Sequence, residues 1–248
     1  MPGLLKTSNI ALNEKTFQGR IAIGGEAMTL QGTINKTGFL LFCVSASAAW
    51  TWWLAHTQVP EAVMPWMWGG LLGGLVFGFV TILKKEWALA TAPLYALCEG
   101  LALGGLSAFL DRIYHGIAIQ ALGLTFGVTL IMLALYTFRV LRATPKFTMG
   151  VVAATGGIFI VYIVDIVLRL FGHQVPLLNS AGPWGIAVSV LIVIVAALNL
   201  ILDFDFVETG VNAGAAKYME WYGAFGIMVT LVWMYVEILR LLAKMRQR

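Results

Sequence analysis

The residues of this sequence that could most clearly take part in chemistry are carboxylic acids inside long apolar runs. Glu99, Asp203, Asp205 and Glu237 all fall in or at the end of such runs. An ionised group in an apolar membrane interior is costly unless it is paired or hydrated. When ionised, carboxylates also supply the hard oxygen ligands that suit Ca²⁺. These four residues therefore point to the handling of protons or cations within a membrane.

Asp203 and Glu237 form the sharpest candidate pair. They lie on the last two apolar runs, equidistant from position 220 in the short connection. In an antiparallel hairpin this spacing predicts one depth for both residues. Two carboxyls at one depth in a low dielectric cannot both ionise cheaply, so we expect them to share a proton and titrate as one unit. The spacing alone leaves open a second interpretation, two separate carboxyls at the aqueous ends of their helices.

The other ionisable residues within the runs have simpler interpretations. Asp165 and Arg169 are four residues apart, the spacing of an ion pair on one helix, so we expect a self-neutralising pair. Glu99 stands beside Gly100 without a partner in the sequence. It is either a protonated, hydrogen-bonded carboxyl or a residue that lines a hydrated path.

Long apolar helices must position these residues. With 60% hydrophobic and 11% charged residues, the 248-residue chain is far more apolar than a soluble domain. Continuous runs near the ~20 residues that a helix needs to cross a bilayer predict an all-α, polytopic membrane protein, a seven-transmembrane-helix bundle in a lipid bilayer. The expected spans are 37–55, 64–83, 87–110, 117–138, 148–171, 185–207 and 219–242.

Basic residues predict the orientation of this bundle, since Lys and Arg favour cytoplasmic connections. Residues 1–36 form a polar tail, and 37–248 form the transmembrane domain. The tail and the second, fourth and sixth connections carry Lys6, Lys15, Arg20, Lys36, Lys84, Lys85, Arg139, Arg142, Lys146 and Lys217. The first, third and fifth connections carry only Arg112. We therefore expect a cytoplasmic amino terminus. Seven full crossings would place the basic carboxy-terminal end outside, which conflicts with this bias. Whether the last apolar run crosses the membrane completely therefore stays open.

Composition and motifs argue against nucleic-acid binding and against catalysis. The net charge of +4 is explained by basic connections, and no basic stripe is interleaved with aromatic residues. A serine-type intramembrane protease needs a buried histidine, but His56, His115 and His173 fall in the outer connections. The Gly-x-Gly-Asp string of aspartyl types is absent from the sequence. We expect no enzymatic activity and no cofactor, with Ca²⁺ as a bound or transported ion.

Short motifs along the whole chain resemble those of one membrane-protein family. The longest of them are Met28-Thr29-Leu30-Gln31-Gly32-Thr33, Ala92-Pro93-Leu94-Tyr95-Ala96-Leu97 and Lys217-Tyr218-Met219-Glu220-Trp221-Tyr222. Two more are Leu202-Asp203-Phe204-Asp205 and Met234-Tyr235-Val236-Glu237-Ile238. These motifs are similar to those of the Bax inhibitor-1 family (transmembrane Bax inhibitor motif proteins), in its bacterial branch. The last two resemble the family's Tyr/Phe-Asp-Thr-Gln and Leu-Tyr-Leu-Asp-Phe motifs.

The resemblance implies a function. Asp203 and Glu237 would correspond to the family's two pore aspartates, which implies a pH-sensitive Ca²⁺ leak across a bacterial inner (plasma) membrane, with these two residues as the pH sensor and Ca²⁺ ligands. Glu237 departs from the family's Asp, and Asp205 stands where Gln is usual. The second-span basic residue of the family has no counterpart before Lys84. The alternative is a regulatory membrane protein that binds another membrane protein, such as a membrane-bound protease, through its tail.

Overall fold

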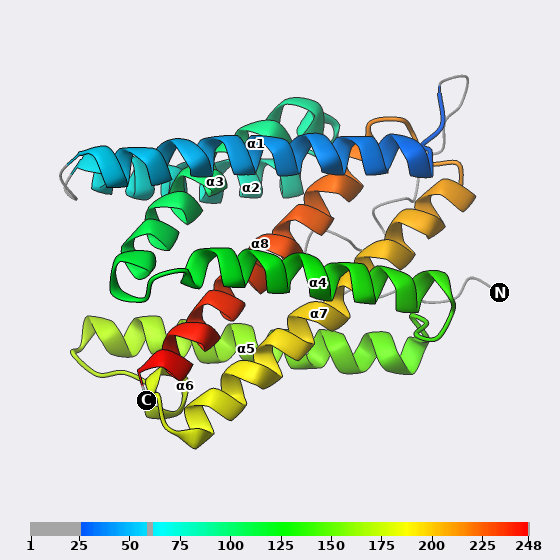
Figure 1. Ribbon diagram of the computed structural model, residues 1–248. Helices are drawn as coiled ribbons and strands as arrows, with labels where there is room; N and C mark the ends of the chain where they lie inside the picture. Colours follow the sequence, from blue (N-terminus) through cyan, green and yellow to red (C-terminus); the bar gives the residue numbers. More distant parts are fainter. Residues whose placement is uncertain (1–25, 59–61, 248) are drawn as a thin grey trace.

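The computed structural model of the protein describes residues 26–58 and 62–247, and these residues form a bundle of α-helices (Figure 1). Seven helices in this part of the chain are long and apolar enough to cross a membrane, which confirms the expected fold class. They are α1 (Leu30–Thr57), α2 (Met64–Leu83), α3 (Ala88–Ile113), α4 (Ile117–Thr137), α5 (Pro145–Leu170), α7 (Pro183–Asn212) and α8 (Met219–Arg246). The short elements η3 (Lys85–Trp87) and α6 (Pro176–Asn179) precede α3 and α7.

The first helix begins at Leu30, well before the expected span 37–55. Thr29 caps it, because its side-chain oxygen accepts a hydrogen bond from the Gly32 amide at 3.0 Å. Lys36 is therefore a helical residue and not part of a tail. The rest of the expected tail, residues 1–25, lies outside the described residues.

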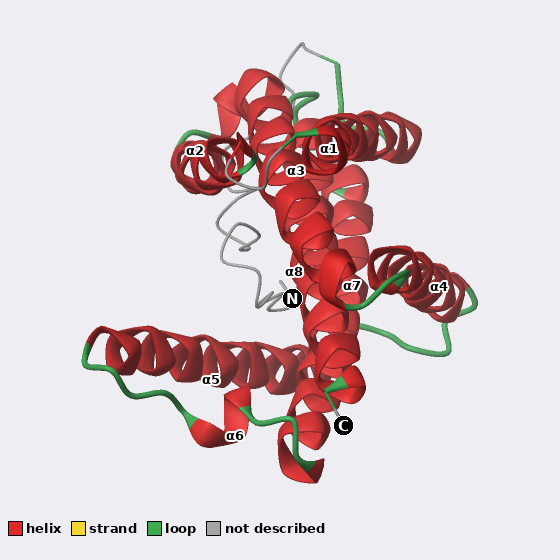
Figure 2. Cartoon of the chain, turned by 60° about the vertical axis from the view of Figure 1, so that its left-hand side comes forward, coloured by secondary structure: helices red, strands yellow, loops and turns green. Residues whose placement is uncertain are grey.

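The last two helices occupy the centre of the bundle. Figure 2 shows α7 and α8 as a central column, with α1, α2 and α3 at one end of it, α4 along one flank and α5 on the opposite side. In the most apolar stretch of α8, 61% of the residues are buried, compared with 11% in α5. The last hairpin is thus the core of the fold, and α5 is its most peripheral long helix.

The contacts of α8 show that it runs the length of the bundle. At the connection 213–218, which we call the turn end, the Lys217 amide donates to the Glu26 carbonyl at 3.0 Å. At the opposite end, which we call the far end, Lys244 Nζ donates to the Leu178 carbonyl at 2.6 Å, and Arg246 Nη1 donates to the His115 carbonyl at 2.8 Å. With 28 residues the helix is about 42 Å long. This length favours seven full crossings over a last segment that re-enters.

Candidate functional site

Asp203 lies in the bundle interior on α7. Its side chain is 0% exposed, and its Oδ2 accepts a hydrogen bond from the Thr230 hydroxyl of α8 at 2.5 Å. Asn199, one turn away on α7, donates to the Thr155 hydroxyl of α5 at 2.9 Å. These contacts make a polar layer that connects α5, α7 and α8 inside an otherwise apolar core.

Glu237 lies in a second polar layer, nearer the far end. It is 2% exposed, and the Tyr162 hydroxyl of α5 donates to its Oε1 at 2.6 Å. Arg240 Nη1 is 3.5 Å from Glu237 Oε2 and also donates to the Tyr162 oxygen at 2.9 Å. The carboxyl thus has a hydroxyl donor from a neighbouring helix and a cation one turn along its own helix.

The two layers correct the expectation that Asp203 and Glu237 share a depth. Asp203 is bonded to Thr230, and Glu237 is seven residues further along α8, about 10.5 Å by the helical rise. The expectation was wrong because it took position 220 as the middle of the turn. Since α7 ends at Asn212 and α8 begins at Met219, the middle of the turn lies earlier in the chain. The carboxyls therefore occupy successive levels along the hairpin.

Glu99 lies at a different helix contact. It sits on α3 and faces α2 at Gly74, where an added Cβ would be only 2.7 Å from the Glu99 Oε1. Of the two interpretations of Glu99, the packing against Gly74 and a side-chain hydrogen bond with Tyr95 favour the hydrogen-bonded carboxyl.

Asp205 belongs to a charged cluster near the turn end, on the side of α7 that faces α4. Its electrostatic neighbours are Glu208, Tyr136 and Arg139. Glu208 accepts hydrogen bonds from the Tyr136 hydroxyl and from Arg139 Nη2, the latter at 2.5 Å. The hydrogen bond and the negative charge of Glu208 raise the pKa of Arg139. Arg139 has a left-handed backbone, with φ of 57°, where α4 ends.

Ionisable groups therefore recur along the hairpin from one end of the bundle to the other. Beyond Glu237 and Arg240, Lys244 is 4% exposed and donates to the Leu178 carbonyl, to Ser189 Oγ at 2.7 Å and to the Gly185 carbonyl at 3.2 Å. From the turn end to the far end the order is Glu208, Asp205, Asp203, Glu237, Arg240 and Lys244. We call these six residues the polar seam.

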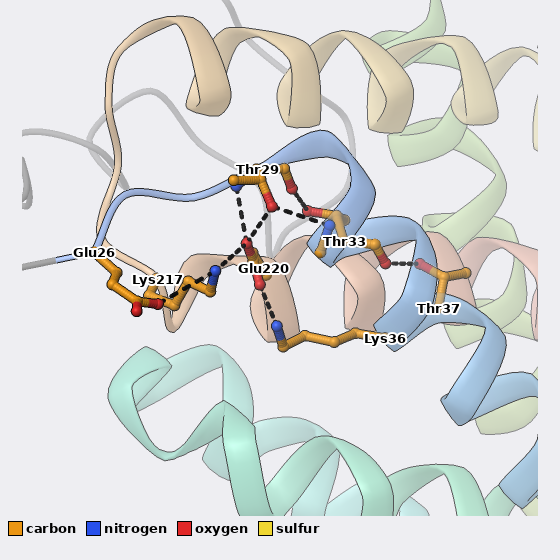
Figure 3. A network of polar contacts seen from close by, with 8 residues as sticks. Glu26, Thr29, Thr33, Lys36, Thr37, Lys217 and Glu220 are labelled. Atoms are coloured by element: carbon orange, nitrogen blue, oxygen red, sulfur yellow. Dashed lines mark hydrogen bonds and ion pairs between the residues drawn. The ribbon is translucent and has the colours of Figure 1, made fainter.

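A second polar cluster holds the turn end together (Figure 3). Glu220, at the start of α8, is 0% exposed and accepts hydrogen bonds from both the amide and the hydroxyl of Thr29 at 2.8 Å. Lys36 of α1 also donates to it, and Lys217 Nζ lies 3.4 Å from its Oε1. The negative charge of Glu220 raises the pKa of Lys217. A single buried carboxylate thus connects the start of α1 with the start of α8.

This Glu220 cluster was absent from the residues expected to form a site, although the sequence contained a signal for it. Two of the motifs that carry the family resemblance, 28–33 and 217–222, meet here. Gly32 is required by the contact, since an added Cβ would be 2.2 Å from Glu220 Oε1. The two motifs are therefore halves of one structural unit.

Replacing Glu220 by glutamine should destabilise the protein, because two lysines would lose their charged acceptor. We expect a loss of about 1–3 kcal/mol, the range for a buried polar group that loses its partner. The measurement is the midpoint of thermal unfolding in detergent. Glu26→Gln is the matched control, because Glu26 is 81% exposed and also pairs with Lys217. Equal midpoints for the two variants would contradict the role assigned to Glu220.

The Asp165 and Arg169 pair is confirmed. Arg169 Nε donates to Asp165 Oδ2 at 2.8 Å. The other carboxylate oxygen accepts from the Val175 amide at 2.8 Å and from Asn179 Nδ2 at 2.7 Å. This carboxylate therefore organises the chain between α5 and α7.

Within the described ranges, no group of three or more His, Cys, Asp or Glu side chains is arranged to hold a metal ion. Asp203 and Glu237 stand in separate layers, so these two carboxyls do not converge on one site.

Comparison with known proteins gives one match. The model of a family described as Bax inhibitor 1 like matches residues 8–247, a range that includes the polar seam, the Glu220 cluster and every helix. No curated protein and no solved structure matches the chain.

Proposed function

The chain belongs to the Bax inhibitor 1 like family, and from this premise we propose that it is a pH-sensitive Ca²⁺ leak channel whose conduction depends on buried carboxylates. The observation that carries the proposal is the polar seam. Four of its members are carboxylic acids, and they follow one another along the central hairpin of a membrane-spanning bundle. Ionisable residues within membrane spans commonly mark ion pathways.

The positions of the carboxyls suit stepwise passage of a cation. Glu208 is the most exposed of the four, and Asp205 is next to it near the turn end. Asp203 and Glu237 lie deeper and are separated by about two helical turns. Conduction needs several sites that bind a cation weakly enough to release it, and carboxylates at successive levels meet that condition.

The contacts of Glu237 suggest the gate. Glu237 is only 2% exposed and is therefore shielded from solvent. The hydroxyl that donates to it comes from α5, the least buried of the long helices. Protonation of Glu237 would remove the negative charge that attracts Arg240 and strengthens the Tyr162 hydrogen bond. We infer that α5 then moves away from α8 and opens the seam. The flux should therefore rise as the pH falls.

Reconstitution tests this proposal. Purified protein in liposomes that contain a Ca²⁺ indicator should show a protein-dependent Ca²⁺ flux that increases from alkaline to mildly acidic pH. The control is the same liposomes without protein, measured at each pH so that dye response and passive leak are subtracted. Flux at the level of protein-free liposomes over the whole pH series would overturn the proposal.

We further propose that the protein lies in a bacterial inner (plasma) membrane with its turn end in the cytoplasm. Cysteine labelling checks the orientation, in a chain whose Cys43 and Cys98 are replaced by alanine. The variants His115→Cys and Gln247→Cys should react with an impermeant reagent from outside, whereas Ala143→Cys should react only after permeabilisation. The reverse pattern would invert the assignment, and a protected Gln247→Cys would exclude a complete last crossing.

The Glu220 cluster favours a second candidate function, regulation through a bound membrane protein. Residues 26–29 contact the α7–α8 connection, so a partner that holds the preceding segment could act on α8. Deleting residues 1–25 tests this idea and keeps Thr29 in place. The Ca²⁺ flux should survive the deletion, whereas a docking function should be lost.

A further inference from the structure

In Figure 1, α8 crosses behind the space between α1 and α4. Side chains of α1 and α4 line the walls of a groove there, and side chains of α7 and α8 line its floor. It consists of two cavities of about 770 Å³ and 370 Å³, whose walls share Leu41 and Leu231. The rims of the larger cavity include the exposed side chains of Leu30 and Leu133, whereas Leu231 on the floor is buried. The groove therefore opens sideways from the central helix toward the surrounding bilayer.

The larger cavity has the length of one bilayer leaflet. Along α1 its lining extends from Leu30 to Leu41, which is about 16.5 Å by the helical rise. Half of a hydrocarbon core of ~30 Å is ~15 Å. The walls present mostly apolar surface over this distance, and Gly38 leaves open space on α1, since an added Cβ there meets nothing within 4 Å. The cavity thus matches an acyl chain that extends from a headgroup to the bilayer centre.

The mouth of this cavity at the turn end is polar and carries a cation. Arg139 and Glu208 line it, and the Arg139 side chain is 51% exposed. One guanidinium nitrogen contacts Glu208, which leaves other N–H donors of the five in the group for a further acceptor. Arg142 follows in the same connection and Lys146 lies at the start of α5, and both are exposed. Guanidinium groups suit phosphate, and basic residues beside a membrane attract anionic lipids.

We propose that this cavity binds one anionic phospholipid of the surrounding bilayer, with an acyl chain on the floor formed by α7 and α8 and its phosphate at Arg139. The inference does not depend on ion conduction. It depends on a lateral opening, a length of one leaflet and the exposed guanidinium group of Arg139 at the mouth.

Native mass spectrometry of delipidated protein tests the proposal. The probes are phosphatidylglycerol and phosphatidylcholine with identical acyl chains, added in a concentration series. Gly38→Phe directs a ring into the cavity from a position where an added Cβ meets nothing within 4 Å, and Arg139→Gln removes the cation at the mouth. Gly69→Phe is the matched control, because Gly69 on α2 also faces open space but does not line the groove.

We expect the wild-type protein and Gly69→Phe to retain one phosphatidylglycerol more tightly than phosphatidylcholine. Gly38→Phe should lose this bound lipid. Arg139→Gln should weaken phosphatidylglycerol binding roughly tenfold, as expected for a lost charge-assisted hydrogen bond, and should abolish the headgroup preference. Equal retention of the two lipids by the wild type, or undiminished retention by Gly38→Phe, would overturn the proposal.

Discussion

Replacing Glu237 by glutamine is expected to flatten the pH dependence of the Ca²⁺ flux. Glutamine resembles the protonated acid in size and charge, so the variant should conduct at alkaline pH as the wild type does at acidic pH. The lost interactions with Tyr162 and Arg240 are charge-assisted, worth about 1.5–3 kcal/mol for such a hydrogen bond. The alkaline flux should therefore increase by roughly tenfold to a hundredfold. The measurement is flux into liposomes over the same pH series.

Asp203→Asn is the matched comparison, since it removes one carboxylate charge from the other polar layer. Asp203 is bonded to Thr230, about two turns from Glu237 along α8. We expect a lower flux at every pH, because a cation ligand is lost, with the pH dependence retained. If Asp203→Asn also flattened the pH profile, and the double variant added little, the two carboxyls would be one titrating unit. That outcome would contradict the assignment of the gate to Glu237 alone.

Gly104→Ala should lower the stability of the bundle markedly. An added Cβ at Gly104 would be 2.1 Å from Thr51 Oγ1 and 2.3 Å from the Ala48 carbonyl oxygen of α1. The hydroxyl could rotate, but the backbone oxygen cannot, so α1 and α3 would have to separate. We expect a loss of about 1–3 kcal/mol, the range for overpacking in a well-packed core. The midpoint of thermal unfolding in detergent measures it.

The control for this variant is Gly69→Ala. Gly69 lies on α2 in a membrane-spanning helix, but an added Cβ there meets nothing within 4 Å. Alanine also has a better helix propensity than glycine. Gly69→Ala should therefore leave the midpoint unchanged or raise it slightly. A similar decrease in both variants would show that the loss of glycine, rather than the contact between α1 and α3, causes the effect.

The features that the sequence predicted are those that depend on local pattern. Apolar runs of sufficient length determined the fold class, because lipid leaves a chain few other ways to cross. The Asp165 and Arg169 pair was predictable since both partners lie on one helix, four residues apart.

The features that the sequence did not predict depend on contacts between distant residues. The partners of Glu220 are 191 and 184 residues away, at Thr29 and Lys36. The pairing of residues between α7 and α8 depends on where α7 ends. The apolar run in the sequence does not locate that end more precisely than one helical turn. The basic carboxy-terminal end seemed inconsistent with a full crossing. Its Lys244 and Arg246 are instead satisfied by backbone carbonyl and side-chain oxygens of α6, α7 and the α3–α4 connection.

The central position of α8 has a consequence for biosynthesis. The helix with the largest buried share also follows the six other long helices of the described chain, so it is synthesised after them. Until then the earlier helices lack the surface on which α1, α3, α4 and α7 pack. The nascent protein is therefore a set of inserted helices that lacks its central helix. The bundle is therefore complete only when α8 has entered the bilayer.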